Sequence, residues 1–173
     1  MAEPDHIDGI IAQWRRERPE LDTAALGLVG RLMRTAVLAE EVLVEPLRER
    51  GLEAGWFDVL AALRRTGPPY QLNPKLLMET VMLSSGGMTK RLDRLEQAGL
   101  VKRTPDPDDR RGTLVRLTAR GKRVADRTVE EHIANEERLL EPLDEDERRA
   151  LDELLRRLLV GIEHPVPDPI PAA

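Results

Sequence analysis

The sequence predicts a mainly α-helical protein with one β-hairpin, and three observations lead to that fold class. Apolar residues recur at helical spacing through most of the 173 residues. Two short segments, 100–104 and 113–117, alternate between apolar and polar residues as strands do, and the turn-forming segment 105–112 separates them. Proline and glycine punctuate the chain at short intervals, so each segment is expected to be one short element.

Two helices are expected in the first third of the chain. Residues 7–14 carry one apolar stripe at helical spacing, and Pro19 ends this helix. Asp22 or Thr23 can cap the second helix, which continues to Gly51. Its length of about 25 residues exceeds what a small core usually needs.

Three shorter helices follow. One apolar stripe runs from Trp56 to the Gly-Pro-Pro turn at residue 67. Asn73 followed by Pro74 is typical of a helix start, and that helix is expected to end near Leu83. Ser84 or Ser85 is expected to cap the next helix, which ends at Gly99 and directly precedes the hairpin.

Two longer helices are expected after the hairpin. Thr118 can cap a helix over residues 119–140, and Asp144 can start a last one whose acidic first turn suits the helix dipole. That last helix carries a wide leucine-rich stripe, which would be an unusually large apolar patch if it were exposed. The proline-rich segment 164–173 cannot continue the helix and is expected to be disordered.

The charge of the chain is unevenly distributed. The net charge is -5, but residues 84–123 hold 11 Lys and Arg against 5 Asp and Glu, a local charge of +6. The rest of the chain holds 16 basic and 27 acidic residues, a charge of -11. A basic block in an acidic chain indicates a directed contact with a polyanion.

The order short helix, turn, basic helix, β-hairpin predicts a winged helix-turn-helix. A helix fits the major groove of DNA, and an arginine-tipped hairpin suits the negative potential of the minor groove. The small residues 84–87 would let backbone amides approach a phosphate closely. The predicted DNA contacts are Ser84, Ser85, Gly86, Thr89, Lys90, Arg94, Arg110 and Arg111.

Four stretches, residues 84–96, 99–101, 106–112 and 115–118, resemble the MarR family of transcription regulators, and the resemblance extends over about residues 24–163. It implies a homodimer, joined through the terminal helices, that binds a pseudo-palindromic operator in double-stranded DNA and more often represses than activates. It also implies that Asp109 supports the wing and that Arg111 enters the minor groove.

The resemblance implies one domain over residues 1–163. Residues 51–118 would form the winged-helix DNA-binding core, while residues 1–50 and 119–163 would supply the dimerisation helices.

Within that family the chain is most similar to the urate-responsive branch, and the resemblance implies a ligand site formed by Trp14, Asp58, Arg91 and Arg103. A flat anionic purine suits an aromatic face and a bidentate cation. Arg91 lies on the predicted recognition helix, so a ligand that holds it would act on the element that reads DNA.

Other interpretations of these residues stay open at this point. Trp14 would also serve as a core residue, Asp58 and Arg91 as a structural ion pair, and Arg103 as a phosphate contact. Two arginines would equally suit a polycarboxylate such as citrate or aconitate. A winged helix can also act as a protein-interaction module without DNA, a partner type whose binding would depend little on salt.

Several function classes lack support in the sequence. The chain has no cysteine, and its three histidines, His6, His132 and His164, lie far apart, so neither a thiolate site nor a zinc site is expected. The hairpin tip lacks the glycine and final glutamate of a calcium loop. No cofactor or catalytic motif is present, and neither a signal peptide nor an apolar spanning segment is recognisable, so we expect a cytoplasmic regulator and not an enzyme or a membrane protein.

Overall fold

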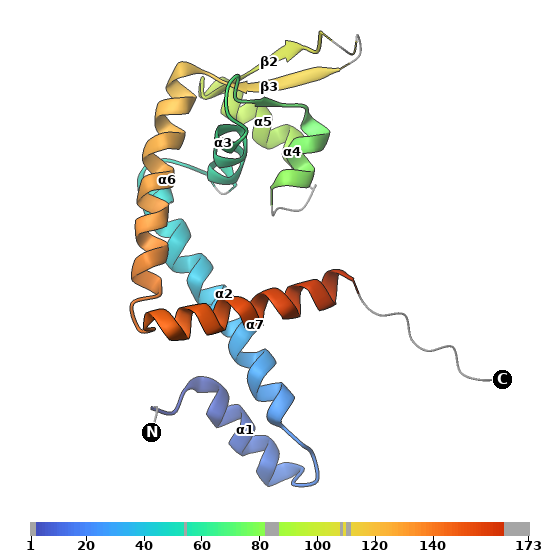
Figure 1. Ribbon diagram of the computed structural model, residues 1–173, viewed down its shortest axis with the longest axis vertical. Helices are drawn as coiled ribbons and strands as arrows, with labels where there is room; N and C mark the ends of the chain where they lie inside the picture. Colours follow the sequence, from blue (N-terminus) through green and yellow to red (C-terminus); the bar gives the residue numbers. More distant parts are fainter. Residues whose placement is uncertain (1–2, 54, 82–86, 108, 110–111, 165–173) are drawn as a thin grey trace, which may run out of the picture. The chain divides into compact units, whose positions relative to one another are not determined.

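The computed structural model describes residues 3–53, 55–81, 87–107, 109 and 112–164. The chain divides into two compact units, one up to Ile133 and one from Ala134 onward. The first unit contains α1 (His6–Glu17), α2 (Ala24–Glu49), α3 (Trp56–Arg65), β1 (Gln71–Leu72), α4 (Pro74–Thr80), α5 (Met88–Gln97), β2 (Val101–Pro105), β3 (Thr113–Leu117) and most of α6 (Ala119–Leu139) (Figure 1).

The first unit has its core between α3, α4, α5 and the small sheet. Mainly aliphatic side chains fill it, together with Trp56, and the C-terminal end of α2 contributes Leu47. From α6, Ala125 completes this core. Its fully buried side chains include Val59, Leu60, Leu63, Leu77, Leu95 and Val115.

The sheet has three antiparallel strands in the order β1-β3-β2. The predicted hairpin is confirmed as β2 and β3, whose register pairs Val101 with Leu117 and Arg103 with Val115. The sequence prediction missed β1, which pairs Gln71 with Arg116 along the other edge of β3. This strand ties the loop before α4 to the wing.

Local capping chemistry sets most helix starts. Asn73 caps α4 through its side chain, which accepts a hydrogen bond from the Leu76 amide at 2.8 Å. The Thr118 hydroxyl accepts the Gly121 amide at 2.9 Å and opens α6. Two boundaries were predicted wrongly: α4 ends at Thr80 instead of near Leu83, and α5 begins after Gly87, which is its N-cap in place of a serine and has a φ of 93°.

A charged cluster joins α3 to α6. The Asp126 carboxylate accepts hydrogen bonds from Lys122, at 2.6 Å, and from the Arg64 guanidinium. These two cations hold the pKa of Asp126 below its usual range, with the Lys122 bond as the larger cause. Both cations also stand over the Tyr70 ring, with Arg64 Cζ 5.0 Å from its centroid.

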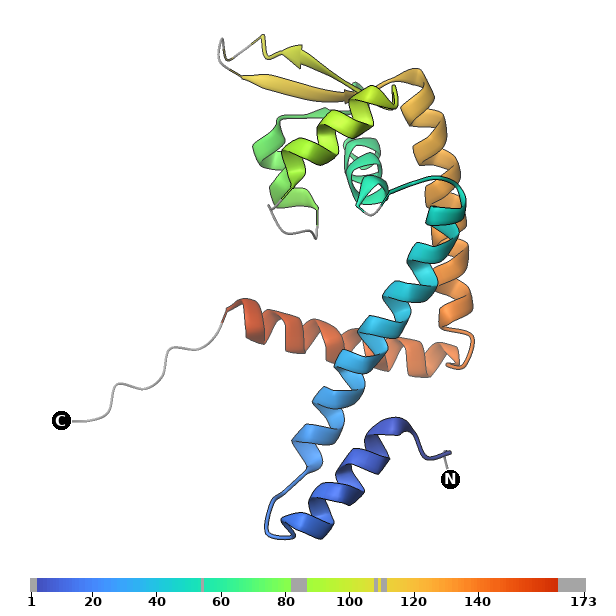
Figure 2. The ribbon, with the colours of Figure 1, turned by 180° about the vertical axis from the view of Figure 1, so that it is seen from behind.

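At the N-terminal end of the first unit, α1 packs against the start of α2 (Figure 2). The Ile7 side chain is buried against the backbone of Gly30, and Ile11 lies against Gly27. Asp5 caps α1 and also pairs with Arg31 of α2, with Oδ2 2.6 Å from Nε. These contacts fix α1 on the first two turns of α2.

The second unit consists of the end of α6 and α7 (Glu145–Glu163). Asp144 starts α7 with a capping box that includes Glu147, as the sequence predicted. His164 is its C-cap, and the rest of the predicted tail lies outside the described residues. Within the described residues, no helix combines the length and apolar content needed to cross a bilayer.

Candidate functional site

The helix α5 has one buried face and one exposed polar face. Met88, Leu92 and Leu95 are at most 3% exposed and hold the helix on the core. Thr89, Lys90 and Arg94, three of the predicted DNA contacts, are exposed. The Arg94 guanidinium pairs with Glu53 from the loop before α3. Ser84, Ser85 and Gly86 lie outside the described residues, so their predicted role stays a prediction.

The wing strand β2 is braced against α5 by Arg103. This residue shares the inner face of the sheet with Val101, because alternate residues of a strand point to the same side. Its Nη2 lies 2.7 Å from Asp93 and its Nη1 2.9 Å from Glu96, while its amide donates to Glu96 at 2.8 Å. Arg103 is thus engaged by two carboxylates, whereas the sequence suggested a ligand or phosphate contact.

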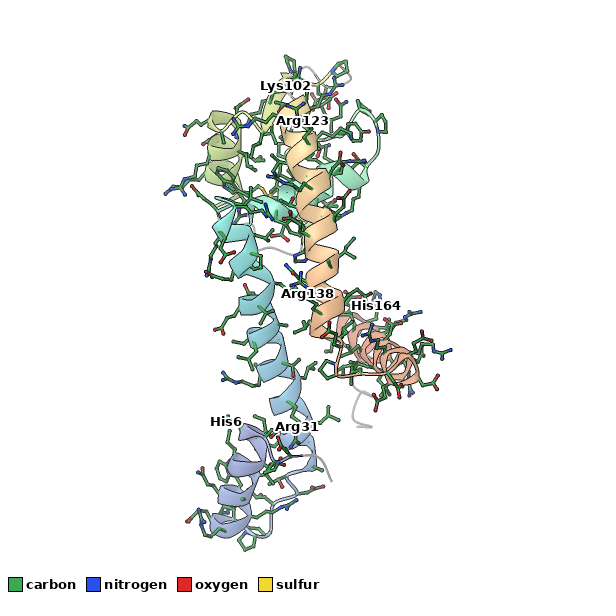
Figure 3. The ribbon with its side chains drawn as sticks, turned by 90° about the vertical axis from the view of Figure 1, so that its left-hand side faces the viewer. His6, Arg31, Lys102, Arg123, Arg138 and His164 are labelled. Atoms are coloured by element: carbon green, nitrogen blue, oxygen red, sulfur yellow. The ribbon has the colours of Figure 1, made fainter. Side chains whose placement is uncertain are left out.

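The outer face of the wing carries a pair of cations that the sequence prediction missed. Lys102 and Arg116 are both exposed and stand directly opposite each other in the register of β2 and β3. Figure 3 labels Lys102 near the end of the unit where α6 begins. Like charges opposite each other destabilise a sheet unless an anion lies between them, which makes this pair a candidate phosphate contact. The sequence contained a signal for this pair, because alternate residues of a strand share a face and both cations directly follow an apolar valine.

The wing tip is closed by short backbone bonds. The Gly112 amide donates to the Asp109 carbonyl at 2.8 Å, and the Asp106 amide donates to the Gly112 carbonyl at 3.1 Å. A Cβ on Gly112 would lie 2.9 Å from the Asp106 Cβ, so the tip requires glycine there. Arg110 and Arg111 lie outside the described residues, and the support of Arg111 by Asp109 stays a prediction.

Arg91 occupies a different environment from the other cations of α5. Its guanidinium packs on the backbone of Gly55, the N-cap of α3, so closely that a Cβ there would lie 2.6 Å from Nε. Its Nη1 is buried and has no hydrogen-bond partner among the described residues. A pocket of about 200 Å³ adjoins it, lined by Glu53, Trp56, Gly87, Lys90, Arg91 and Arg94. A buried, unpartnered N–H group of this kind favours an anionic ligand.

Of the four predicted ligand residues, only Arg91 lines this pocket. Asp58 is half-buried on α3, and among the described residues no ion pair joins it to Arg91, so the alternative interpretation of these two residues as a structural pair gains no support. Trp14 is 42% exposed and lies on α1, which packs against the start of α2. Leu47, near the other end of α2, enters the core that Arg91 adjoins. At 1.5 Å per residue, roughly 35 Å of helix separates these two ends.

Comparison with known proteins identifies the chain. It is 40% identical to the HTH-type transcriptional regulator PecS of Dickeya dadantii over 158 residues, which are 91% of this chain and 95% of PecS. The family model described as MarR family matches residues 50–112. This chain belongs to the MarR family. Its likeness to PecS fits the branch that the sequence resembles. The multiple antibiotic resistance protein MarR of Escherichia coli is 32% identical over 69% of this chain and 82% of its own length.

Solved MarR family structures match the fold. A MarR variant from E. coli complexed with operator DNA superposes with a TM-score of 0.67 at 28% identity, over 84% of this chain and 97% of the other. A MarR family regulator from Streptomyces coelicolor in complex with DNA gives a TM-score of 0.72 at 26% identity, over 84% and 92% of the two chains. This MarR family chain is therefore a DNA-binding transcription regulator, which decides against the protein-interaction alternative. Its relatives are regulators, not enzymes.

Proposed function

We propose that this chain is a homodimeric repressor whose hold on operator DNA is released by a small anionic ligand bound at Arg91. The observation that carries the ligand proposal is the buried Nη1 of Arg91, which lacks a partner among the described residues and adjoins a pocket. Within that pocket Lys90, Arg91 and Arg94 face a single carboxylate, Glu53. An anion would therefore enter a site with excess positive charge.

Ligand and DNA would compete for the same helix. Lys90 and Arg94 are exposed on the face of α5 that we assign to DNA, and both also line the Arg91 pocket. A bound anion would draw these side chains toward the pocket and away from phosphates. The two ligands then favour different arrangements of one element, which is the requirement for allosteric release.

Apolar side chains left exposed on two helices support the homodimer. On α7, none of the described residues is buried in the single chain, and its leucine stripe stays open. On α2, which is 26 residues long, only Gly27 and Leu47 are buried, and a comparable apolar stripe is exposed. Isolated soluble chains rarely expose patches of this kind, and a second copy is the partner typical of this family. The exposed set comprises Leu26, Leu28, Val29, Leu32, Met33, Val37, Leu38, Val42, Leu151, Leu154, Leu155, Leu158, Leu159, Val160 and Ile162.

A second copy would also supply Trp14. Trp14 lies on α1 at the start of α2, whereas Arg91 adjoins the core at the C-terminal end of α2. One chain therefore does not place Trp14 and Arg91 in one pocket. If Trp14 takes part in the site, it must come from the partner protomer, and the site is complete only in the dimer.

Urate is our first choice of ligand, and a polycarboxylate such as citrate or aconitate is the alternative. Urate rests on the resemblance of the four residues Trp14, Asp58, Arg91 and Arg103 to the urate-responsive branch. The polycarboxylate is favoured by the three cations of the pocket. Of the two predicted ligand arginines, Arg103 is engaged by Asp93 and Glu96, which leaves Arg91 available to either ligand.

The test measures DNA release and ligand binding separately. Labelled operator bound by the protein is titrated with urate, xanthine, citrate and aconitate while fluorescence anisotropy reports release. Ligand binding to the free protein is then followed by calorimetry for wild type, Arg91→Ala and the control Arg149→Ala, whose arginine is exposed on α7. We expect Arg91→Ala alone to lose heat of binding. Full binding by Arg91→Ala would refute the site, and release by a tricarboxylate but not urate would replace the first choice.

Mixed dimers test the origin of Trp14. Protomers with Trp14→Ala and protomers with Arg91→Ala are each expected to bind no ligand. When the two are combined in one dimer, a site shared between protomers is restored in one of its two copies, because wild-type Trp14 then faces wild-type Arg91. A site formed within one chain would give no recovery, which would contradict the shared arrangement.

A further inference from the structure

An arginine on the exposed face of α5 is held by a carboxylate from outside the helix. Arg94 donates through Nη1 to Glu53, which lies in the loop between α2 and α3, and the two side chains form an ion pair. Both side chains are half-exposed, so the pair is open to solvent and to DNA. An exposed ion pair adds little to stability, so what this one chiefly sets is the position of the guanidinium.

The backbone of Glu53 is fixed independently of α5. Leu52, directly before it, is 6% exposed and belongs to the core. The Glu53 carbonyl accepts the amide of Trp56 at 3.0 Å, and Trp56 is itself 8% exposed in the first turn of α3. The loop is therefore attached to the core on both sides of the carboxylate, which gives Arg94 a support that does not depend on its own helix.

The ion pair leaves one edge of the Arg94 guanidinium available. Glu53 engages Nη1, and within the described residues neither Nε nor Nη2 forms a hydrogen bond. These two groups form a planar edge of the kind that pairs with O6 and N7 of guanine in the major groove. Thr89 and Lys90, the other exposed residues of α5 that we assign to DNA, cannot form this paired contact, because a hydroxyl has one donor and an ammonium acts as a point charge.

We propose that Glu53 is a positioning residue for base recognition, which orients Arg94 so that its free Nε and Nη2 edge binds a guanine of the operator. The proposal rests on the assignment of the exposed face of α5 to DNA and does not involve the ligand. An arginine that is ordered before binding spares the complex the entropy cost of ordering it. Without Glu53, Arg94 would be free to contact any nearby phosphate, and a phosphate contact carries no sequence information.

Base-preference profiles measured without ligand test this role. Affinity is determined for the operator, for operators in which each base pair of one half-site is replaced in turn, and for an unrelated duplex of the same length. For the wild-type protein we expect a guanine whose replacement weakens binding about 5–150-fold, the range of one bidentate arginine contact. Placing 7-deazaguanine there, which lacks N7, should also weaken binding. Arg94→Ala should lose the preference at that position alone.

Glu53→Ala should weaken the same guanine preference without removing the arginine. The ratio of operator affinity to unrelated-duplex affinity should fall about 2–10-fold for each half-site, because Arg94 must then be ordered on binding. Glu79→Ala is the matched control, since it removes an exposed carboxylate of α4 that forms no ion pair in the described part of the chain. It should leave both the profile and the ratio unchanged.

Two kinds of failure are distinguishable. A Glu53→Ala profile identical to that of wild type, an unchanged or larger affinity ratio for this variant, or the same loss of preference with Glu79→Ala would each overturn the positioning role. A guanine preference that survives Arg94→Ala would refute the contact assignment on which the proposal rests. Urea unfolding of each variant checks that the fold is intact.

Discussion

Replacing Gly55 by alanine tests whether the position of Arg91 sets the ligand response. A Cβ on Gly55 would lie 2.6 Å from Arg91 Nε and 2.7 Å from Cζ, whereas ordinary contacts begin at 3.4 Å. The guanidinium would therefore have to move by roughly 1 Å, since the backbone is the less yielding partner. A shift of that size removes Nη1 from its buried position, so we expect the ligand concentration for half release to rise about tenfold, or about 1.4 kcal/mol.

A second glycine provides a matched control for the backbone. Gly55 has a φ of +76°, and Gly67 has a φ of +75° with no atom near its Cβ position. Alanine in this left-handed region costs about 1–2 kcal/mol at either position. Gly55→Ala and Gly67→Ala should therefore lose similar stability, with a fall in Tm of about 2–4 °C per kcal/mol. Only Gly55→Ala should change the ligand response.

The assay follows anisotropy of labelled operator against each member of the purine and organic acid panel. Half-release concentrations are compared after correction for each variant's operator affinity without ligand, and urea unfolding at fixed protomer concentration gives stability. If Gly55→Ala and Gly67→Ala shift the half-release concentration equally, backbone strain accounts for the effect. The link from Gly55 through Arg91 to the ligand would then be refuted.

Further predictions concern the wing and the core. Gly121→Ala places a Cβ 1.8 Å from a backbone oxygen of the residue before β2, so it should lower the free energy of unfolding in urea by about 1–3 kcal/mol. Gly9 has open space around it, so Gly9→Ala should raise the same quantity by about 0.5–1 kcal/mol. A change of the same sign for both variants would contradict the packing argument. Arg103→Gln should weaken operator binding without changing the slope of log K against log salt concentration, because Arg103 engages carboxylates and not phosphates. Lys102→Gln should reduce the magnitude of that slope by about 1. Anisotropy or calorimetric titrations at several salt concentrations measure both slopes. Because the folded pKa of Asp126 is lowered, its contribution is present above about pH 4 and is lost as the pH falls further, so the stability difference between wild type and Asp126→Asn should shrink in acid; a constant difference would contradict this.

The parts of the fold that the sequence predicted well depend on local chemistry. Asn73 and Asp144 both cap the helices expected of them, because a short polar side chain can satisfy the free amides of the next turn wherever it stands. The strand β1 was missed because its two residues carry no periodic signal and depend on the far edge of β3. The start of α5 was placed too early because a serine N-cap was expected from residues 84 and 85, whereas the N-cap is Gly87 in a left-handed conformation.

In the candidate site, too, the features that depend on local spacing were predictable from the sequence, and those that depend on tertiary contacts were not. Exposure of Lys90 and Arg94 followed from the helical period of α5. The inward direction of Arg103 was available from the alternation that begins at Val101, but its two carboxylate partners lie on α5 and required the tertiary structure. The packing of Arg91 on Gly55 joins residues 36 positions apart and leaves no trace in sequence spacing.

The attachments of α5 bear on how the proposed ligand would control it. Three apolar side chains fix its inner face, but its polar sides depend on exposed or half-exposed ion pairs, Arg94 with Glu53 and Arg103 with Asp93 and Glu96. Such pairs are each worth about 0–1 kcal/mol, and allosteric coupling typically amounts to about 1–3 kcal/mol. One anion at Arg91 that redirects Arg94 from Glu53 or from a phosphate therefore acts on the scale of the contacts it replaces. A helix fixed only by buried packing would need far more binding energy to move, so the weak polar attachment of α5 is the feature that would make the proposed release by a small molecule feasible.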